Sequence, residues 1–226
     1  MSRPRVSAVA LALLLGACGS SGNGSEARTK TTAPATTAPG VGTSGPAKPA
    51  PTYTTEVLQK LLVPISEVPR GFSVQPPNAG DDETQVCDEA AFPRAQRTAR
   101  ADVSYISGQV AVLSEELTSY ASTKEAESVM RNARSAFERC KTFDETDGDG
   151  AVTHYTLAPM SFDRLADDQV AFRLTFEADA VSGKGDFVAV RFGSLIMVTA
   201  GLSASSEQLD PGVFASFTKT AYERIT

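Results

Sequence analysis

Hydrophobic and polar residues alternate along the second half of the chain in the way expected for β-strands. From Val170 to Glu177 every second residue is valine, phenylalanine or leucine, and the residues between them are smaller or polar. This period of two is typical of a strand with one buried face and one face in water. Apolar runs at 187–192 and 195–199 flank Gly193 and Ser194, and they predict a β-hairpin. Residues 152–157 begin another candidate strand.

Apolar residues at steps of three and four predict helices in two further regions. The first helix covers Thr55–Leu62 and is stopped by Pro64. The second follows Ser122 and Glu125, which have the spacing of a capping box. Its apolar face runs from Ala126 to Cys140, with charged residues on the opposite face.

A last helix is predicted near the end of the chain, where Asp210 is the cap, Pro211 takes the first helical position, and apolar residues recur as far as Ile225. Two more strands are predicted near 102–107 and 109–119. The order helix, strands, helix, antiparallel strands, helix favours the α+β class. We expect a curved antiparallel sheet with helices packed on one face.

Residues 1–17 have the composition of a bacterial signal peptide. Two arginines precede residues 6–15, which carry no charge. Ten helical residues span about 15 Å, half of the hydrocarbon core, so this segment predicts a processing signal rather than a transmembrane anchor. Leu15-Gly16-Ala17-Cys18 resembles the lipobox of bacterial lipoproteins. We therefore predict that Cys18 carries fatty acyl chains such as palmitate; the alternative is a secretory signal with an incidental cysteine.

The rest of the chain divides into a tether and one domain. Residues 18–52 comprise the predicted lipidated cysteine and a segment rich in Thr, Pro, Ala and Gly. This segment has almost nothing to bury and is expected to be disordered. A coil of this length reaches on the order of 30 Å. Residues 53–226 have the length of a single globular domain.

Cys87 and Cys140 remain once Cys18 is acylated. Export places them in an oxidising compartment, where a pair of thiols in one domain predicts a disulfide. The alternative is two free, buried cysteines.

Loss of residues 1–17 leaves 19 basic and 27 acidic side chains, a net charge of −8. Bulk electrostatics would not draw such a protein to nucleic acid or to anionic lipid headgroups. Membrane association would therefore depend on the acyl chains, and two chains anchor stably where one does not.

The sequence contains no pattern that predicts catalysis or a metal site. His154 is the only histidine and has no Gly-x-Ser-x-Gly motif to accompany it. The acidic run at 144–150 fails as an EF-hand because Thr156 falls where the bidentate glutamate should be. We expect no catalytic, metal or cofactor-binding residue.

Other chemistry-bearing residues have structural interpretations. The acidic pairs Glu115-Glu116 and Asp167-Asp168 are interpreted as exposed charges at strand ends. Glycines at 183, 185 and 193 are interpreted as turn residues that adopt positive φ. Phenylalanines at 172, 176 and 192 are expected in the core rather than in a binding site.

Three stretches resemble the extracellular sensor domain of actinobacterial receptor serine/threonine kinases, a domain that also occurs alone in lipoproteins. They are Leu61-Leu62-Val63-Pro64 leading to Val68–Phe72, the helix that ends at Cys140, and the run 188–198 followed by a closing helix. The resemblance covers roughly residues 54–226. It implies a sheet with a cleft that binds an unidentified ligand, and no enzymatic activity. A second resemblance is to compact α/β lipoproteins similar to the photosystem subunit P protein.

These observations favour a lipid-anchored protein on the outer face of the cell membrane that binds a small or lipidic ligand without transforming it. The alternative is a structural or protein-interaction lipoprotein that docks another envelope protein. A hydrolase has little support, and no nucleic-acid partner is expected.

Overall fold

The computed structural model describes residues 53–76, 85–87, 89–93, 96–108, 111–146, 150–178, 181–204 and 209–226. The predicted signal peptide (1–17), the predicted lipidation site Cys18 and the tether (18–52) lie outside the described residues. All of the described residues belong to one structural unit.

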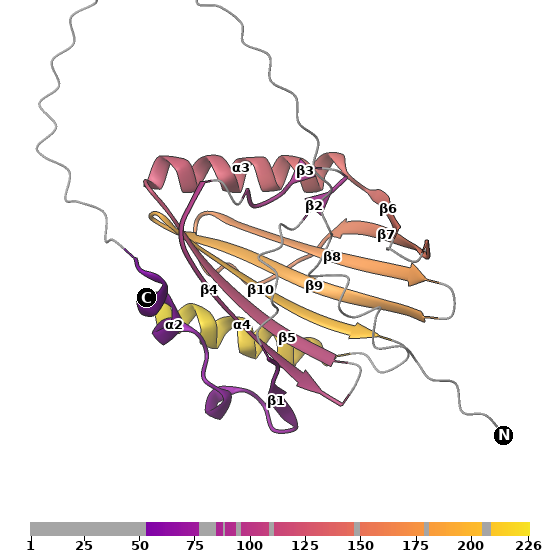
Figure 1. Ribbon diagram of the computed structural model, residues 1–226, viewed down its shortest axis with the longest axis horizontal. Coiled ribbons are helices and arrows are strands. Elements are labelled where there is room, and N and C mark those ends of the chain that lie inside the picture. The colour runs from indigo at the N-terminus through magenta and orange to yellow at the C-terminus, as the bar shows by residue number, and fades with distance from the viewer. Residues whose placement is uncertain are drawn as a thin grey trace, which may run out of the picture. The chain divides into compact units, whose positions relative to one another are not determined.

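Eight antiparallel strands form one open sheet in the order β1-β4-β5-β10-β9-β8-β7-β6 (Figure 1). Their bounds are β1 Phe72–Val74, β4 Arg97–Ser107, β5 Ala111–Tyr120, β6 Thr142–Thr146, β7 Val152–Pro159, β8 Gln169–Ala178, β9 Val181–Phe192 and β10 Leu195–Ala204. A separate short hairpin pairs β2 (Gln85–Val86) with β3 (Glu89–Ala90). The antiparallel sheet and the α+β class predicted from the sequence are confirmed.

The sheet confirms the predicted hairpin. Strands β9 and β10 pair from Phe192 opposite Leu195 onwards, and Gly193 between them has φ +55°. Only glycine adopts this conformation at little cost, so the turn chemistry explains the hairpin. The alternating residues 170–177 lie in β8, where Val170, Phe172 and the two apolar residues that follow at steps of two are buried.

The three predicted helices are present as α2 (Thr55–Leu61), α3 (Thr123–Arg139) and α4 (Pro211–Ile225), with a short 3₁₀ turn η2 (Ile65–Glu67) after α2. The side chain of Ser122 accepts a hydrogen bond from the Glu125 N–H at 3.2 Å. The side chain of Asp210 likewise accepts one from the Gly212 N–H at 2.7 Å. Both caps satisfy backbone groups that a helix start leaves without partners.

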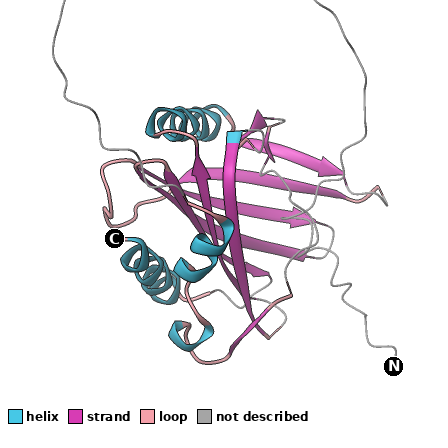
Figure 2. Ribbon diagram, turned by 60° about the vertical axis from the view of Figure 1, so that its left-hand side comes forward, coloured by secondary structure: helices cyan, strands magenta, loops and turns pink. Residues whose placement is uncertain are grey.

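The expectation that the helices pack on one face of the sheet is wrong. Helix α3 packs on one face, and α2 and α4 pack on the other (Figures 1 and 2). Alternate residues of the central strand β10 show the division, because Ile196 belongs to the α3 core while Leu195 and Met197 belong to the α4 core. Strands buried on both faces carry continuous apolar runs, which is why 195–202 contains so few polar residues.

The prediction that Gly183 and Gly185 are turn residues is wrong. Both glycines lie inside strand β9. A Cβ built on Gly183 would lie 2.3 Å from the ring of Phe176 and 2.4 Å from the backbone oxygen of Ser203. A Cβ on Gly185 would lie 2.4 Å from Leu202. These glycines therefore make room for large neighbours on the sheet surface, a common role of glycine within strands.

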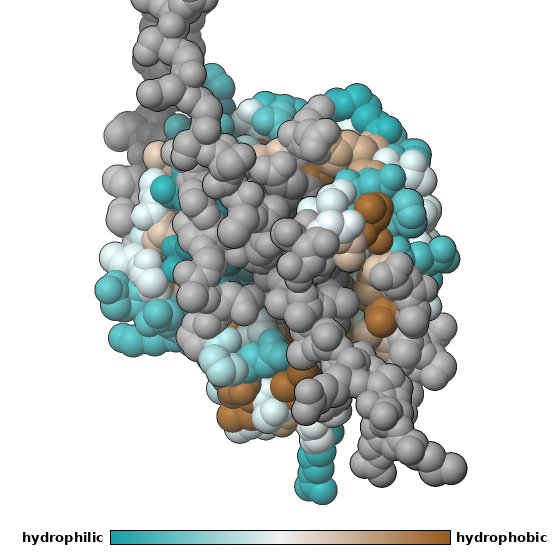
Figure 3. Space-filling view, turned by 45° about the vertical axis from the view of Figure 1, so that its right-hand side comes forward, coloured by the Kyte–Doolittle hydropathy of each residue, from teal (hydrophilic) through white to brown (hydrophobic). Residues whose placement is uncertain are grey.

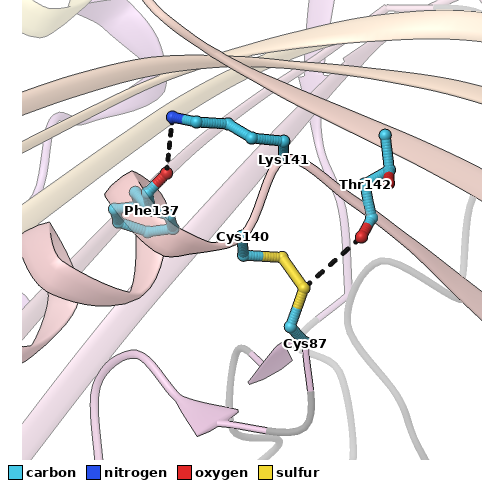
Figure 4. Close-up of a disulfide and its surroundings, with 5 residues drawn as sticks. All are labelled: Cys87, Phe137, Cys140, Lys141 and Thr142. Atoms are coloured by element: carbon cyan, nitrogen blue, oxygen red, sulfur yellow. Dashed lines mark hydrogen bonds between the residues drawn. A yellow bond between two sulfur atoms is a disulfide. The ribbon is translucent and has the colours of Figure 1, made fainter.

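A disulfide joins Cys87 to Cys140, the pairing predicted from the sequence (Figure 4). The two Cα atoms are 5.9 Å apart, within the usual range. Cys87 follows β2 and has φ +49°, and Cys140 is the C-cap residue of α3. The bond therefore fixes the β2–β3 hairpin to the end of the helix.

Candidate ligand groove

A groove lies where the C-terminal part of α3 crosses the ends of β7 and β8. Its volume is about 210 Å³. The helix contributes Arg134, Phe137 and Glu138, and Lys141 follows the helix. The strands contribute residues 157–159 and 169–172.

The floor of the groove is aromatic and aliphatic. The Phe137 ring of α3 stacks on the Phe172 ring of β8 with centroids 3.8 Å apart. Phe172 stacks in turn on Phe187 of β9, with centroids 4.8 Å apart and planes nearly parallel. Leu157 and Val170 complete the floor and are themselves buried. This packing fixes the floor, because each ring is held by a neighbour on another element.

The rim carries charged groups held by their own contacts. The Arg134 side chain donates a hydrogen bond to Asp168 Oδ1 at 3.0 Å, and the Arg191 side chain donates to Asp168 Oδ2 at 2.6 Å. Burial acts to raise the pKa of Asp168, but hydrogen bonds from the two arginines outweigh it and lower the pKa below its usual value. The Lys141 ammonium donates to the carbonyl oxygen of Phe137 (Figure 4).

Beside the groove, the end of β7 extends past the start of its neighbour β6. The last cross-strand bond on this side joins the Leu157 N–H to the carbonyl oxygen of Lys141 at 2.7 Å. Two residues further along β7, the next outward position is Pro159, which has no N–H to donate. Pro159 thus ends the pairing of this edge without leaving an unsatisfied donor.

Two acidic residues that the sequence analysis placed among exposed charges are not exposed. Asp168 is largely covered by the two arginines. Glu115 on β5 is only 1% exposed and faces the α4 core. The period of two places Glu115 on the same strand face as Leu113 and Leu117, a signal that the sequence analysis did not use. Its neighbour Glu116 lies on the other face and pairs with Arg100 at 3.0 Å.

Of the residues considered for catalysis or metal binding, the structure brings together one exposed pair, His154 and Asp144. His154 is exposed on β7, with its Nδ1 2.6 Å from Asp144 Oδ1 on β6. Within the described ranges, no group of three or more His, Cys, Asp or Glu side chains is placed to hold a metal ion. Residues 147–149 of the acidic run lie outside those ranges. Among the described helices, none is both long and apolar enough to span a bilayer.

Sequence reasoning identified Phe172 as core but did not identify it as part of the groove. Phe172 and Phe176 are buried on the α3 face, whereas Phe192 is half-buried on the opposite face against Tyr222. The groove residues come from three segments separated along the chain, so no local pattern could have grouped them.

The fold has a counterpart among solved structures. The extracellular domain of PknH from Mycobacterium tuberculosis aligns with a TM-score of 0.61 and 11% sequence identity, covering 79% of this chain and 98% of that domain. This chain has the fold of the PknH extracellular domain. The fold implied by the sequence resemblance is thereby supported, and identity this low establishes the fold alone. No protein-family model and no curated protein matches the chain.

Proposed function

We propose that this protein is a non-catalytic, extracytoplasmic binding protein, anchored to the outer face of the cell membrane through lipid on Cys18. In this proposal the α3–β7–β8 groove binds the apolar end of a small or lipidic ligand. The observation that carries the proposal is a preformed groove with a stacked aromatic floor and a charged rim. The shared fold with an extracellular domain supports the cellular location.

The size of the groove limits what it can hold. Binding pockets for drug-sized molecules measure about 300–1,000 Å³, whereas this groove measures about 210 Å³. It therefore suits one ring or a few methylene groups, with the rest of the ligand on the surface near Arg134 and Lys141. Apolar burial at about 25 cal/mol per Å² would supply affinity, and the rim would orient the polar part.

A larger side chain in the groove is expected to abolish the stabilisation of the protein by a bound ligand. A thermal-shift screen of the unlipidated mature chain against envelope lipids and glycans should give at least one positive. A ligand at a hundred times its Kd adds about 2.7 kcal/mol, a shift of several degrees in Tm. Val170→Phe should remove that shift because Val170 faces the groove.

The matched control is Val152→Phe, at an exposed position outside the groove at the start of β7. It should keep the full ligand-induced shift. If the ligand still raises the Tm of folded Val170→Phe protein, the ligand binds outside the groove. If no compound in the screen raises the Tm of the wild-type protein, the result counts against ligand binding.

Changing Cys18→Ala is expected to remove the protein from the membrane fraction or leave it uncleaved. The reason is that a chain without the acylated thiol lacks the acyl chains that hold it in the bilayer. Cell fractionation with immunoblotting measures the distribution, and Ser20→Ala serves as the control that keeps wild-type behaviour. A processed, membrane-bound Cys18→Ala protein would rule out lipid anchoring.

The alternative, a protein-interaction role, is favoured by one edge of the sheet. Among the described strands, β1 forms one edge of the sheet and carries no charged residue, and its Val74 is 53% exposed. Ile65 of η2, a segment that contacts β1, is also exposed. The opposite edge, β6, carries Asp144 and Glu145, the kind of charge that discourages edge pairing. Apolar residues form small separate patches on the face in Figure 3. Native mass spectrometry of protein taken from its membrane distinguishes a small ligand from a protein partner.

A further inference from the structure

The first segment of the domain is held against the sheet by three side chains from three different elements. Glu115 Oε2 on β5 accepts a hydrogen bond from the Val63 N–H at 2.8 Å. The Tyr105 hydroxyl on β4 donates to the Val63 carbonyl oxygen. Arg224 on α4 donates to the carbonyl oxygens of Leu61 and Lys60, at 3.0 Å each. The segment 53–63 is therefore fastened through its backbone.

Glu115 is the unusual member of this group. Its side chain is almost fully buried, and its Oε1 has no hydrogen-bond partner within the described part of the chain. A buried carboxylate oxygen without a donor is costly, so such a group needs an explanation. Its cross-strand neighbours are Val103 and Thr199, and neither is charged.

The charged and titratable groups around Glu115 are few. Arg224 faces it from α4, and Tyr105 faces it from β4. Glu67 of η2 approaches the same cluster but forms an ion pair with Arg224 at 3.1 Å. Burial raises the pKa of Glu115 to about 7, against the opposing effects of the Val63 N–H and Arg224. Burial also raises the pKa of Tyr105 to about 12, so this hydroxyl stays protonated near neutral pH.

We infer that residues 53–63 form a proton-operated latch, which stays closed on the sheet while Glu115 is protonated and opens more often once Glu115 is ionised. When the segment lifts, water reaches the carboxylate and removes the cost of burying its charge. Opening exposes Leu58 and Val63 of the latch, which are buried in the core that also contains Leu113 and Leu117 on either side of Glu115. The latch is the first described segment of the domain and directly follows the predicted tether in the sequence.

The sign of the pH effect follows from the two states. The closed state holds its proton up to about pH 7, whereas an open, hydrated Glu115 has the ordinary pKa of 4.5. Raising the pH through this window favours the open state, and the effect levels off above about pH 7. Between pH 5 and pH 8 the closed-to-open ratio should fall roughly 70-fold.

Hydrogen exchange with mass spectrometry on the unlipidated mature chain tests the latch. Exchange of the Leu58, Leu62 and Val63 amides, corrected for the intrinsic pH dependence, should lose protection by roughly 70-fold between pH 5 and pH 8. Peptides from α3 should show no such change. In Glu115→Gln the latch peptides should keep constant protection over this range.

Two variants make the interpretation specific. Glu116→Gln makes the same chemical change one residue away, on the opposite face of β5, and should keep the wild-type pH dependence. Tyr105→Phe removes one backbone fastening and should lower protection at every pH without changing the slope. Wild-type latch peptides whose protection does not depend on pH would overturn the inference, even if Glu115→Gln fails to fold. An unchanged slope in folded Glu115→Gln would overturn it as well.

Discussion

Replacing both Cys87 and Cys140 with serine is expected to lower the free energy of unfolding by about 4 kcal/mol. The bond closes a loop between residues 53 positions apart. In the chain-entropy model, a cross-link of this span restricts the unfolded chain by about that amount. The variant also frees the β2–β3 hairpin from the end of α3, so Val86, Ala91 and Phe92 of the α3 core lose their covalent support.

Urea unfolding followed by circular dichroism measures this change. Wild-type protein kept under a reducing agent should unfold at the same midpoint as the double serine variant. The single-residue control is Ser135→Ala, at a half-buried position of α3 near the bond, where the hydroxyl accepts a hydrogen bond from Arg139. It should lower the free energy of unfolding by only about 1 kcal/mol, clearly less than the double variant. A double variant as stable as the oxidised protein would show that the disulfide contributes nothing to stability.

Changing Phe172→Ala is expected to cost about 3–5 kcal/mol, the usual range for a buried phenylalanine. The Phe172 ring lies between Phe137 of α3 and Phe187 of β9, so its removal opens a cavity between helix and sheet. Loss of the ring also removes the floor of the groove. Stability and ligand binding should therefore fall together in this variant.

Phe192→Ala is the matched control on the other face of the sheet. Phe192 is only half-buried, and its described ring contact is with Tyr222 at a centroid distance of 5.2 Å. Its replacement should cost clearly less than that of Phe172 and leave ligand binding unchanged. Denaturant unfolding measures the free energy of unfolding of both variants. Equal losses of stability would contradict the view that the stacked rings of Phe137, Phe172 and Phe187 are the main contact between α3 and the sheet.

Local patterns in the sequence predicted the elements well because each depends on neighbouring residues. The capping pair Ser122 and Glu125, the period of two in 170–177 and the turn at Gly193 all act within a few residues. Strand β4 begins five residues earlier than the predicted start at 102, where small and charged residues conceal the alternation.

The side of the sheet on which each helix lies depends on contacts that a local pattern does not contain. The sequence does contain one indication of helices on both faces: residues 187–192 and 195–202 are apolar at both odd and even positions. Strands of this kind are covered on both faces, and this fact requires helices on both sides. The period of two shared with Leu113 and Leu117 points Glu115 to the buried face. Its burial was missed because an acidic residue in a strand normally faces water.

The sheet that separates two cores also bears on how such a sequence can diverge. Neighbouring residues of β10 belong to different cores, and a substitution in one core has few direct contacts in the other. Mutations in separate contact networks tend to add independently. Each core can therefore accept its own set of compensating substitutions while the backbone of the sheet between them is retained.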